Sequence, residues 1–216
     1  MKLNLLKLNL LKLTIFTSLM FSLGAQAEQP SSELKVKGTV GISSCTVIAP
    51  DDGIYDLGRI SSSLVKPGTA TTELPAIKKT WTINCDLATY LRYRSTDNRL
   101  DSVSDTSSSL NHGLGNINGT GKIGFYTAKT SNHHVDGKST LIYSTVVSGT
   151  GTGSNLYNNM GFIVFSDESR TAIAGKSFDF DVTISPILAG TTTMNGPITE
   201  DANIDGSTSI NFSFGI

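Results

Sequence analysis

The sequence is poor in charged and aromatic residues, and neither sign of charge dominates. Its 216 residues include 17 Lys and Arg against 18 Asp and Glu, so the formal net charge is −1, and only 16% of all residues are charged. Without a basic excess, no nucleic-acid partner is expected. Aromatic residues make up 7% of the chain, with a single tryptophan. No amphipathic helical pattern longer than a turn or two occurs, whereas short alternating apolar runs lie among Ser, Thr, Gly and Asn. This composition predicts an all-β protein.

Reacting groups in catalytic arrangements are also missing. No Gly-x-Ser-x-Gly motif occurs, and the glycine-rich segments lack the Lys-Ser/Thr ending of a phosphate loop. His112 is isolated and His133 and His134 are adjacent, so exposed loop histidines are favoured over a metal site. Asp179 and Asp181 alternate with apolar residues, which favours plain solvation over a pair of catalytic carboxylates. We therefore predict a protein that is not an enzyme and that needs no cofactor or metal.

The longest apolar run lies at the N-terminus, over residues 13–23. Three lysines precede this run, and Ala25-Gln-Ala27 suits cleavage by a signal peptidase. The alternative is a membrane anchor, but the run is shorter than the ~20 residues that a spanning helix needs. We predict a cleaved signal peptide over residues 1–27 and an exported mature chain that begins at Glu28.

Only two cysteines are present, Cys45 and Cys85. Because an exported chain folds in an oxidising compartment, a single disulfide between them is expected. A metal pair or a redox Cys-x-x-Cys site lacks the required spacing. Closing a loop of about 40 residues is worth roughly 4 kcal/mol in the chain-entropy model. Trp81 and Ile83 share a face with Cys85, so we expect the tryptophan in the core near the disulfide.

Residues 33–47, close to the predicted mature N-terminus, already alternate like a strand. Leu34, Val36, Val40 and Ile42 share one parity, Gly38 leaves a gap in the same face, and the inward face changes near residues 43–44. At the other end of the sequence, a clean apolar face is formed by Ile210, Phe212, Phe214 and Ile216. Exposed alternating segments are an aggregation hazard unless another chain pairs with them. Strand addition between subunits is a physical mode that uses such ends.

Several short motifs occur in an order that is similar to a known family. Residues 34–40 (LKVKGTV) leading to Cys45, then residues 56–58 (DLG) and 81–85 (WTINC), resemble the N-terminal half of a chaperone-usher fimbrial subunit. Residues 96–99 (TDNR), 112–115 (HGLG) and 121–126 (GKIGFY) resemble, more specifically, a beta-fimbrial major-subunit family. The resemblance covers most of the mature chain.

The resemblance implies an incomplete immunoglobulin-like β-sandwich that lacks its last strand and is completed by a donor strand from a neighbour. It also implies a disulfide that joins the first strand to a later one. Residues 28–37 correspond to the donor extension, with Ser32, Leu34 and Val36 as donor-strand residues, and residues 38–216 to the pilin-like domain, whose first strand covers 38–47. The groove strand, with which a periplasmic chaperone pairs, corresponds to Ile210, Phe212, Phe214 and Ile216.

The function that the resemblance implies is a structural fimbrial subunit that polymerises by donor-strand exchange and supports cell adhesion. Its partners would be identical or related pilin subunits, a periplasmic chaperone, an outer-membrane usher and a possible host-surface receptor. Its location would be a fimbrium on the cell surface, reached through the periplasm. An alternative is a secreted carbohydrate-binding or tip-adhesin module, with Tyr126 and Tyr157 in loops that contact sugars. A secreted hydrolase is a third, less favoured hypothesis.

Overall fold

The computed structural model describes residues 32–215. The predicted signal peptide, the first residues of the predicted extension and Ile216 lie outside the described residues. Residues 1–40 and 41–216 form two separate units. In the first unit, the described residues 32–40 contain no helix or strand, and all of them are exposed. All elements of regular structure described below belong to the second unit.

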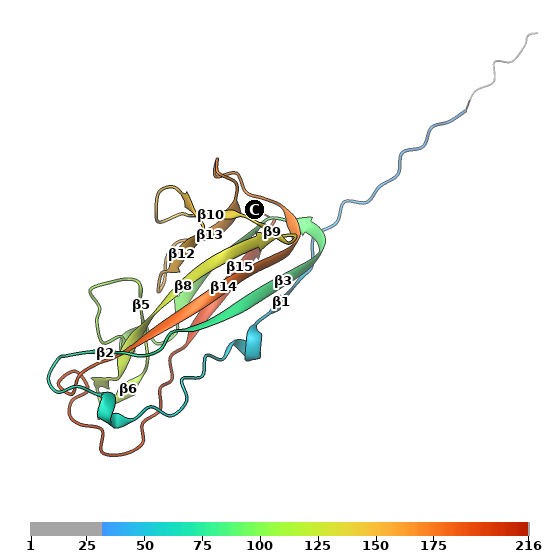
Figure 1. Ribbon diagram of the computed structural model, residues 1–216. Coiled ribbons are helices and arrows are strands. Elements are labelled where there is room, and N and C mark those ends of the chain that lie inside the picture. Colours follow the sequence, from blue (N-terminus) through green and yellow to red (C-terminus); the bar gives the residue numbers. More distant parts are fainter. Residues whose placement is uncertain (1–31, 216) are drawn as a thin grey trace, which may run out of the picture. The chain divides into compact units, whose positions relative to one another are not determined.

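The larger sheet has eight strands, and every ladder in it is antiparallel (Figure 1). These strands are β1 (Cys45–Ile48), β2 (Thr72–Glu73), β3 (Ile77–Thr89), β5 (Asn111–Gly113), β8 (Gly124–Val135), β9 (Lys138–Ser139), β12 (Gly153–Leu156) and β14 (Gly175–Leu188). The main order is β1-β3-β14-β8-β12, with β2 paired to β14, and β5 and β9 paired to β8. The long strand β14 is central, because β3 and β8 pair along its two edges.

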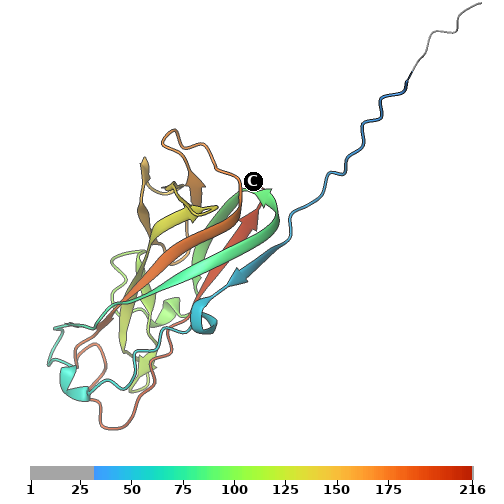
Figure 2. The ribbon, with the colours of Figure 1, turned by 45° about the vertical axis from the view of Figure 1, so that its right-hand side comes forward.

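The smaller sheet has five strands in the order β11-β10-β13-β4-β15. They are β4 (Leu91–Asp97), β10 (Leu141–Ser144), β11 (Thr150–Gly151), β13 (Ile163–Ser166) and β15 (Thr208–Phe214). A two-stranded ribbon joins β6 (Asn116–Ile117) to β7 (Gly121–Lys122), and three short 3-10 helices are η1 (Pro50–Gly53), η2 (Ser62–Leu64) and η3 (Leu100–Ser102). Figure 2 gives a second view, with β14 in orange and β15 in red.

The two sheets pack face to face through large aromatic side chains. Tyr93 of β4 stacks on Phe180 of β14 with ring centroids 4.6 Å apart. Phe165 of β13 meets Phe178 of β14 edge to face at 5.2 Å. All four side chains are fully buried. The period-two alternation of β14 places these rings inward, as the sequence predicts. The fold is therefore an all-β, immunoglobulin-like sandwich, which confirms the predicted fold class.

The predicted disulfide is present, but the first strand is shorter than predicted. Cys45 and Cys85 are bonded and lie directly opposite each other in the β1–β3 ladder. The structure begins β1 at Cys45 rather than at residue 38. The Asp86 carboxylate accepts a hydrogen bond of 2.8 Å from the Ser44 backbone N–H. At Ser44, therefore, a side chain rather than a backbone carbonyl accepts the N–H, and only the Asp86 N–H to Ser44 carbonyl bond of 3.0 Å continues the backbone pairing beyond Cys45.

Candidate functional site

A groove of about 1500 Å³ lies between the two sheets. Trp81, Val182 and Ile184 line it from the larger sheet, and Ile210 of β15 lines it from the smaller one. Loop residues over 52–62 and 198–206 form its margins. Trp81, Ile184 and Ile210 are only partly buried although they pack against the core. The groove therefore exposes apolar surface that a sandwich with one more strand would cover.

Strand β15 has one paired edge and one open edge. It pairs with β4 over all seven of its residues, so that Phe212 lies opposite Tyr93. Within residues 32–215, no strand pairs with its other edge. Ile210, Phe212 and Phe214 point toward the core and are half-buried. The row of backbone N–H and C=O groups along that open edge is available to another strand.

Tyr55 links a loop at the margin of the groove to strands β3 and β14 of the larger sheet. The Trp81 indole N–H donates to the Tyr55 hydroxyl at 3.0 Å, and that hydroxyl lies 3.4 Å from the Val182 carbonyl to which it donates. The Lys79 ammonium stands 5.4 Å from the centroid of the Tyr55 ring. Burial raises the pKa of Tyr55, so the phenol stays a neutral donor. Trp81, which we expected in the core beside the disulfide, thus faces the groove and is held by a loop residue that the sequence analysis missed.

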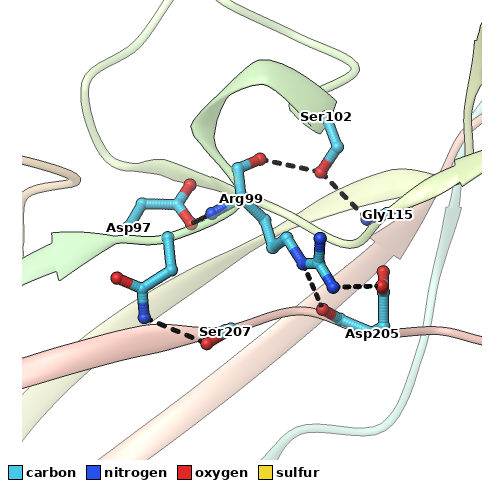
Figure 3. A network of polar contacts seen from close by, with 7 residues as sticks. Asp97, Arg99, Ser102, Gly115, Asp205 and Ser207 are labelled. Atoms are coloured by element: carbon cyan, nitrogen blue, oxygen red, sulfur yellow. Dashed lines mark hydrogen bonds and ion pairs between the residues drawn. The ribbon is translucent and has the colours of Figure 1, made fainter.

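A polar network holds the segment that leads into β15 (Figure 3). The Arg99 guanidinium pairs with the Asp205 carboxylate at 2.6 Å and also donates to the Asp205 carbonyl at 3.3 Å. The Ser102 hydroxyl donates to the Arg99 carbonyl and accepts from the Gly115 N–H. Gly115 has φ +101°, and a Cβ there would lie 2.0 Å from the Asp205 carboxylate. Two of the sequence motifs, 96–99 and 112–115, therefore have a structural role, because their residues hold the segment that leads into β15.

The structure contradicts the prediction that His112 is an exposed loop residue. His112 is fully buried in β5, with Nδ1 3.0 Å from the Thr208 hydroxyl and Nε2 3.2 Å from the Leu156 carbonyl. Because a carbonyl only accepts, Nε2 carries the proton. Tyr126 stacks on the ring and hydrogen-bonds to Thr208 at 2.6 Å. Burial lowers the pKa of His112 and raises the pKa of Tyr126 to about 12. Tyr126 is also buried, which removes it from the predicted sugar-contacting loops.

His133 is likewise a core residue rather than an exposed one. It lies on β8 with an inward parity, and its Nε2 is 2.8 Å from the Tyr93 hydroxyl. Burial lowers the pKa of His133 to about 4. His134, with the opposite parity, is partly exposed. Neither histidine belongs to a cluster of three or more metal-ligating side chains within the described part of the chain.

Asp179 and Asp181 lie on the outer face of β14, but solvation alone does not describe them. Thr82 donates to Asp179 at 2.7 Å, and Thr80 donates to Asp181 at 2.6 Å. Asp181 is only 4% exposed and pairs with Lys78 at 3.2 Å. Burial raises the pKa of Asp181, but the hydrogen bonds from Thr80 and Lys78 outweigh it, so the pKa is lowered overall. These are cross-strand structural pairs.

The predicted donor residues lie in the first unit, and the groove lies in the second. Ser32 is exposed, and Leu34 and Val36 are 90% and 91% exposed. Val40 and Ile42, which we assigned to the first strand, are as exposed as these two. The apolar alternation is therefore longer than the predicted extension and reaches to within three residues of Cys45.

These observations define an all-β sandwich with an apolar groove and an open edge strand. The chain belongs to a family described as "Protein of unknown function (DUF1120)", whose model matches residues 34–141. Comparison with curated proteins finds no match. Among solved structures, the chain is similar to one titled "Crystal structure of the P pilus rod subunit PapA", with 14% identity and a TM-score of 0.41 over 79% of this chain and 98% of that one. Within residues 32–215, no helix has the length and apolar character needed to span a membrane.

Proposed function

We propose that this protein is a non-enzymatic structural subunit of a surface fibre that polymerises by donor-strand exchange. The observation that carries the proposal is the open edge of β15 beside the apolar groove. A strand from another copy that pairs with this edge satisfies its backbone groups and covers Trp81, Ile184 and Ile210. Pairing of this kind gains main-chain hydrogen bonds along the edge and specificity from alternate side chains in the groove.

The donor is the N-terminal segment 32–42 of a neighbouring copy. Its four apolar side chains share one parity, and Gly38 occupies the same row. Nine residues from 34 to 42 reach roughly 30 Å when extended. This length suffices to run along the seven residues of β15. The proposed donor thus contains the predicted Ser32, Leu34 and Val36 and extends them by Val40 and Ile42.

The energy of assembly comes from apolar area that the isolated subunit cannot cover. Leu34, Val36, Val40 and Ile42 are almost fully exposed, and covering each is worth ~1.5–3 kcal/mol. The donor and the groove are different surfaces of the same chain, so the interface is heterologous and repetition produces a fibre rather than a closed ring. Before assembly, the same groove needs a temporary occupant, which is the role that a periplasmic chaperone would have.

The remaining parts of the proposal follow the resemblance to chaperone-usher fimbrial subunits. The subunit is exported, transferred from chaperone to outer-membrane usher, and displayed on the cell surface in a fimbrium that supports adhesion. The Cys45–Cys85 disulfide is in keeping with folding in an oxidising compartment.

The proposal is tested with charge substitutions in the donor. Leu34→Asp or Val36→Asp should abolish the ladder of polymers seen when undenatured samples are run on a gel, because burying an unpaired carboxylate costs several kcal/mol. The melting temperature of the isolated subunit should not change, since these side chains contact nothing in their own domain. Ladders that persist in both variants contradict the proposal. An early-melting monomer would instead favour the monomeric binding-module alternative.

Lys35→Asp is the matched control. Lys35 lies between the two donor positions with the opposite parity, and among residues 32–215 it forms one ion pair, with Glu33 at 3.1 Å. The substitution introduces more negative charge than Leu34→Asp does, yet its side chain points away from the groove in the proposed complex. Polymer ladders should therefore remain, which separates burial of a charge from charge repulsion.

A further inference from the structure

The outer face of the smaller sheet carries three arginines on two aromatic rings. The guanidinium carbons of Arg92 and Arg94 lie 4.4 and 5.4 Å from the centroid of the Phe162 ring. The guanidinium carbon of Arg170 lies 4.9 Å from the centroid of Tyr143. We call these five residues the arginine face. Arg94 and Arg170 are exposed, and Arg92 is partly so.

The strand register places the arginine face on one surface. On β4, the odd-numbered residues 91, 93 and 95 are buried between the sheets, so Arg92 and Arg94 point outward. Tyr143, the ring that Arg170 of the loop after β13 contacts, pairs with Val164, and Val164 pairs with Arg92, so Tyr143 lies two strands from Arg92 on the same face. Neighbouring strands are roughly 4.8 Å apart, so the face spans about 10 Å of sheet.

Within residues 32–215, none of the three arginines forms an ion pair with an acidic side chain. Ion pairs within residues 32–215 use other cations, namely Lys35, Arg59, Lys78, Lys79 and Arg99. The Nε atom of Arg92 is buried without a hydrogen-bond partner. The larger sheet is different, because its outer carboxylate Asp181 is paired with Lys78. In a chain of net charge −1, three unpaired guanidiniums on one face form a concentrated positive field.

Polar groups that suit sugar hydroxyls lie next to these cations. Ser213 and Asn211 of β15 are opposite Arg92 and Arg94, and Ser209 is opposite Thr96. A guanidinium held over a ring loses less further freedom when its N–H fork binds a carboxylate or a sulfate. The face therefore offers forks for anions beside hydroxyl and amide groups.

We propose that the arginine face binds an acidic polysaccharide, which carries anionic groups and hydroxyls along one chain. Nucleic acid fits less well, because the rings of Phe162 and Tyr143 are engaged by guanidiniums rather than open for base stacking. Three cations are also fewer than the ~6–10 phosphate contacts of strong DNA binders. The face points away from the groove, so it does not depend on strand exchange. In a fibre, repeated copies would add avidity.

The test uses the purified mature protein with immobilised heparin as a sulfated probe, hyaluronan as a carboxylated probe and dextran as a neutral one. Wild type should bind heparin or hyaluronan in a salt-sensitive way and should not bind dextran. Arg92→Gln with Arg94→Gln should weaken binding by about tenfold or more, because two charge-assisted forks are lost. The single variant Arg94→Gln, at an exposed position, should weaken it by a smaller factor without altering the melting temperature.

The control pair is Lys138→Gln with Lys176→Gln, which removes the same charge from exposed positions on the larger sheet. It should bind as wild type does. Equal loss in the control pair, or unchanged binding in Arg94→Gln and in the folded double variant, overturns the proposal. Tighter binding of double-stranded DNA than of either anionic polysaccharide overturns the choice of ligand. Polymer ladders should be unaffected in every variant, so this result is separate from the fate of the proposed function.

Discussion

The two halves of the core are built differently. Around Tyr93, Phe165, Phe178 and Phe180, both sheets contribute aromatic rings and no side chain is exposed. Around Trp81, Ile184 and Ile210, the same two sheets border the groove, and these apolar side chains are only partly buried. The closed half is fully buried within one chain, whereas the open half leaves apolar side chains partly exposed along the groove.

Burial therefore places most of the stability of the isolated subunit in the closed half. Under the proposed strand exchange, the open half would gain stability when a donor strand enters the groove. Substitutions in the two halves should therefore differ in size, and only those in the open half should depend on a donor.

The largest expected effect is in the closed half. Phe180→Ala should lower the free energy of unfolding of the isolated subunit by ~3–5 kcal/mol, because it removes a fully buried ring that stacks on Tyr93. Chemical denaturation measures the change. Phe125→Ala is the control, since Phe125 lies on β8 with outward parity and is half-buried. If Phe125→Ala lowered the free energy of unfolding as much as Phe180→Ala does, burial would not explain the contribution of Phe180.

The second effect is on pH dependence, also in the closed half. The pKa of His133 is about 4 in the folded protein against 6.5 when exposed. The unfolded chain therefore binds a proton between these values and the folded chain does not, so stability falls as pH drops from 6.5 toward 4. The loss is on the order of 2–3 kcal/mol. The pH slope of the melting temperature over this range should be shallower in His133→Phe, in which the buried His112 still contributes, and unchanged in His134→Gln. An unchanged slope in His133→Phe contradicts the assignment.

The third effect is in the open half and should be smaller. Ile210→Ala should cost ~1–2 kcal/mol in the isolated subunit, because the side chain is only partly buried. When a synthetic peptide of residues 32–44 is added, the peptide should stabilise wild type more than it stabilises this variant. Thermal melts with and without peptide measure both quantities. Equal stabilisation by the peptide would mean that Ile210 does not contact a donor.

The smallest effect is at the fastening of β15. Asp205→Asn should cost less than ~1 kcal/mol, since both partners of the Arg99–Asp205 pair are about half-exposed. High salt should reduce the difference further. Asp201→Asn breaks the far more exposed Arg59–Asp201 pair and should leave the melting temperature unchanged. A larger loss of stability in Asp201→Asn than in Asp205→Asn would show that the network in Figure 3 does not stabilise the start of β15.

Strand parity made much of this fold predictable from the sequence. The alternation of Phe178, Phe180 and Val182 identifies an inward face without any tertiary information, and the two cysteines of a chain predicted to be exported indicate the disulfide. Parity also explains how His133 and His134 differ, but composition suggested a loop there and concealed β8. A local polar composition cannot report that a distant strand, β14, pairs with that segment over its length.

The groove itself was only partly predictable. The three described apolar residues of β15 could be identified by their alternation, but Tyr55 could not, because it is held by a hydrogen bond from Trp81 rather than by a strand. The shortened β1 was also hidden, since the carboxylate of Asp86 takes an N–H 42 residues away in sequence. Side-chain contacts over such distances leave no periodic signal.

The position of the disulfide has a mechanical consequence. In a fibre assembled as proposed, tension enters each sandwich through the residues that precede Cys45. After the hydrogen bonds of Ser43 and Ser44, the first covalent cross-link that resists this tension is the bridge to Cys85, which passes the load into the long strand β3. The bridge closes a segment with a sequence separation of 40, so tension cannot extend this segment while the bridge is intact. Under tension, the oxidised subunit would lengthen by straightening the residues that precede Cys45. Reduction of the disulfide would let β1 separate from β3, and every subunit of the fibre would then lengthen further.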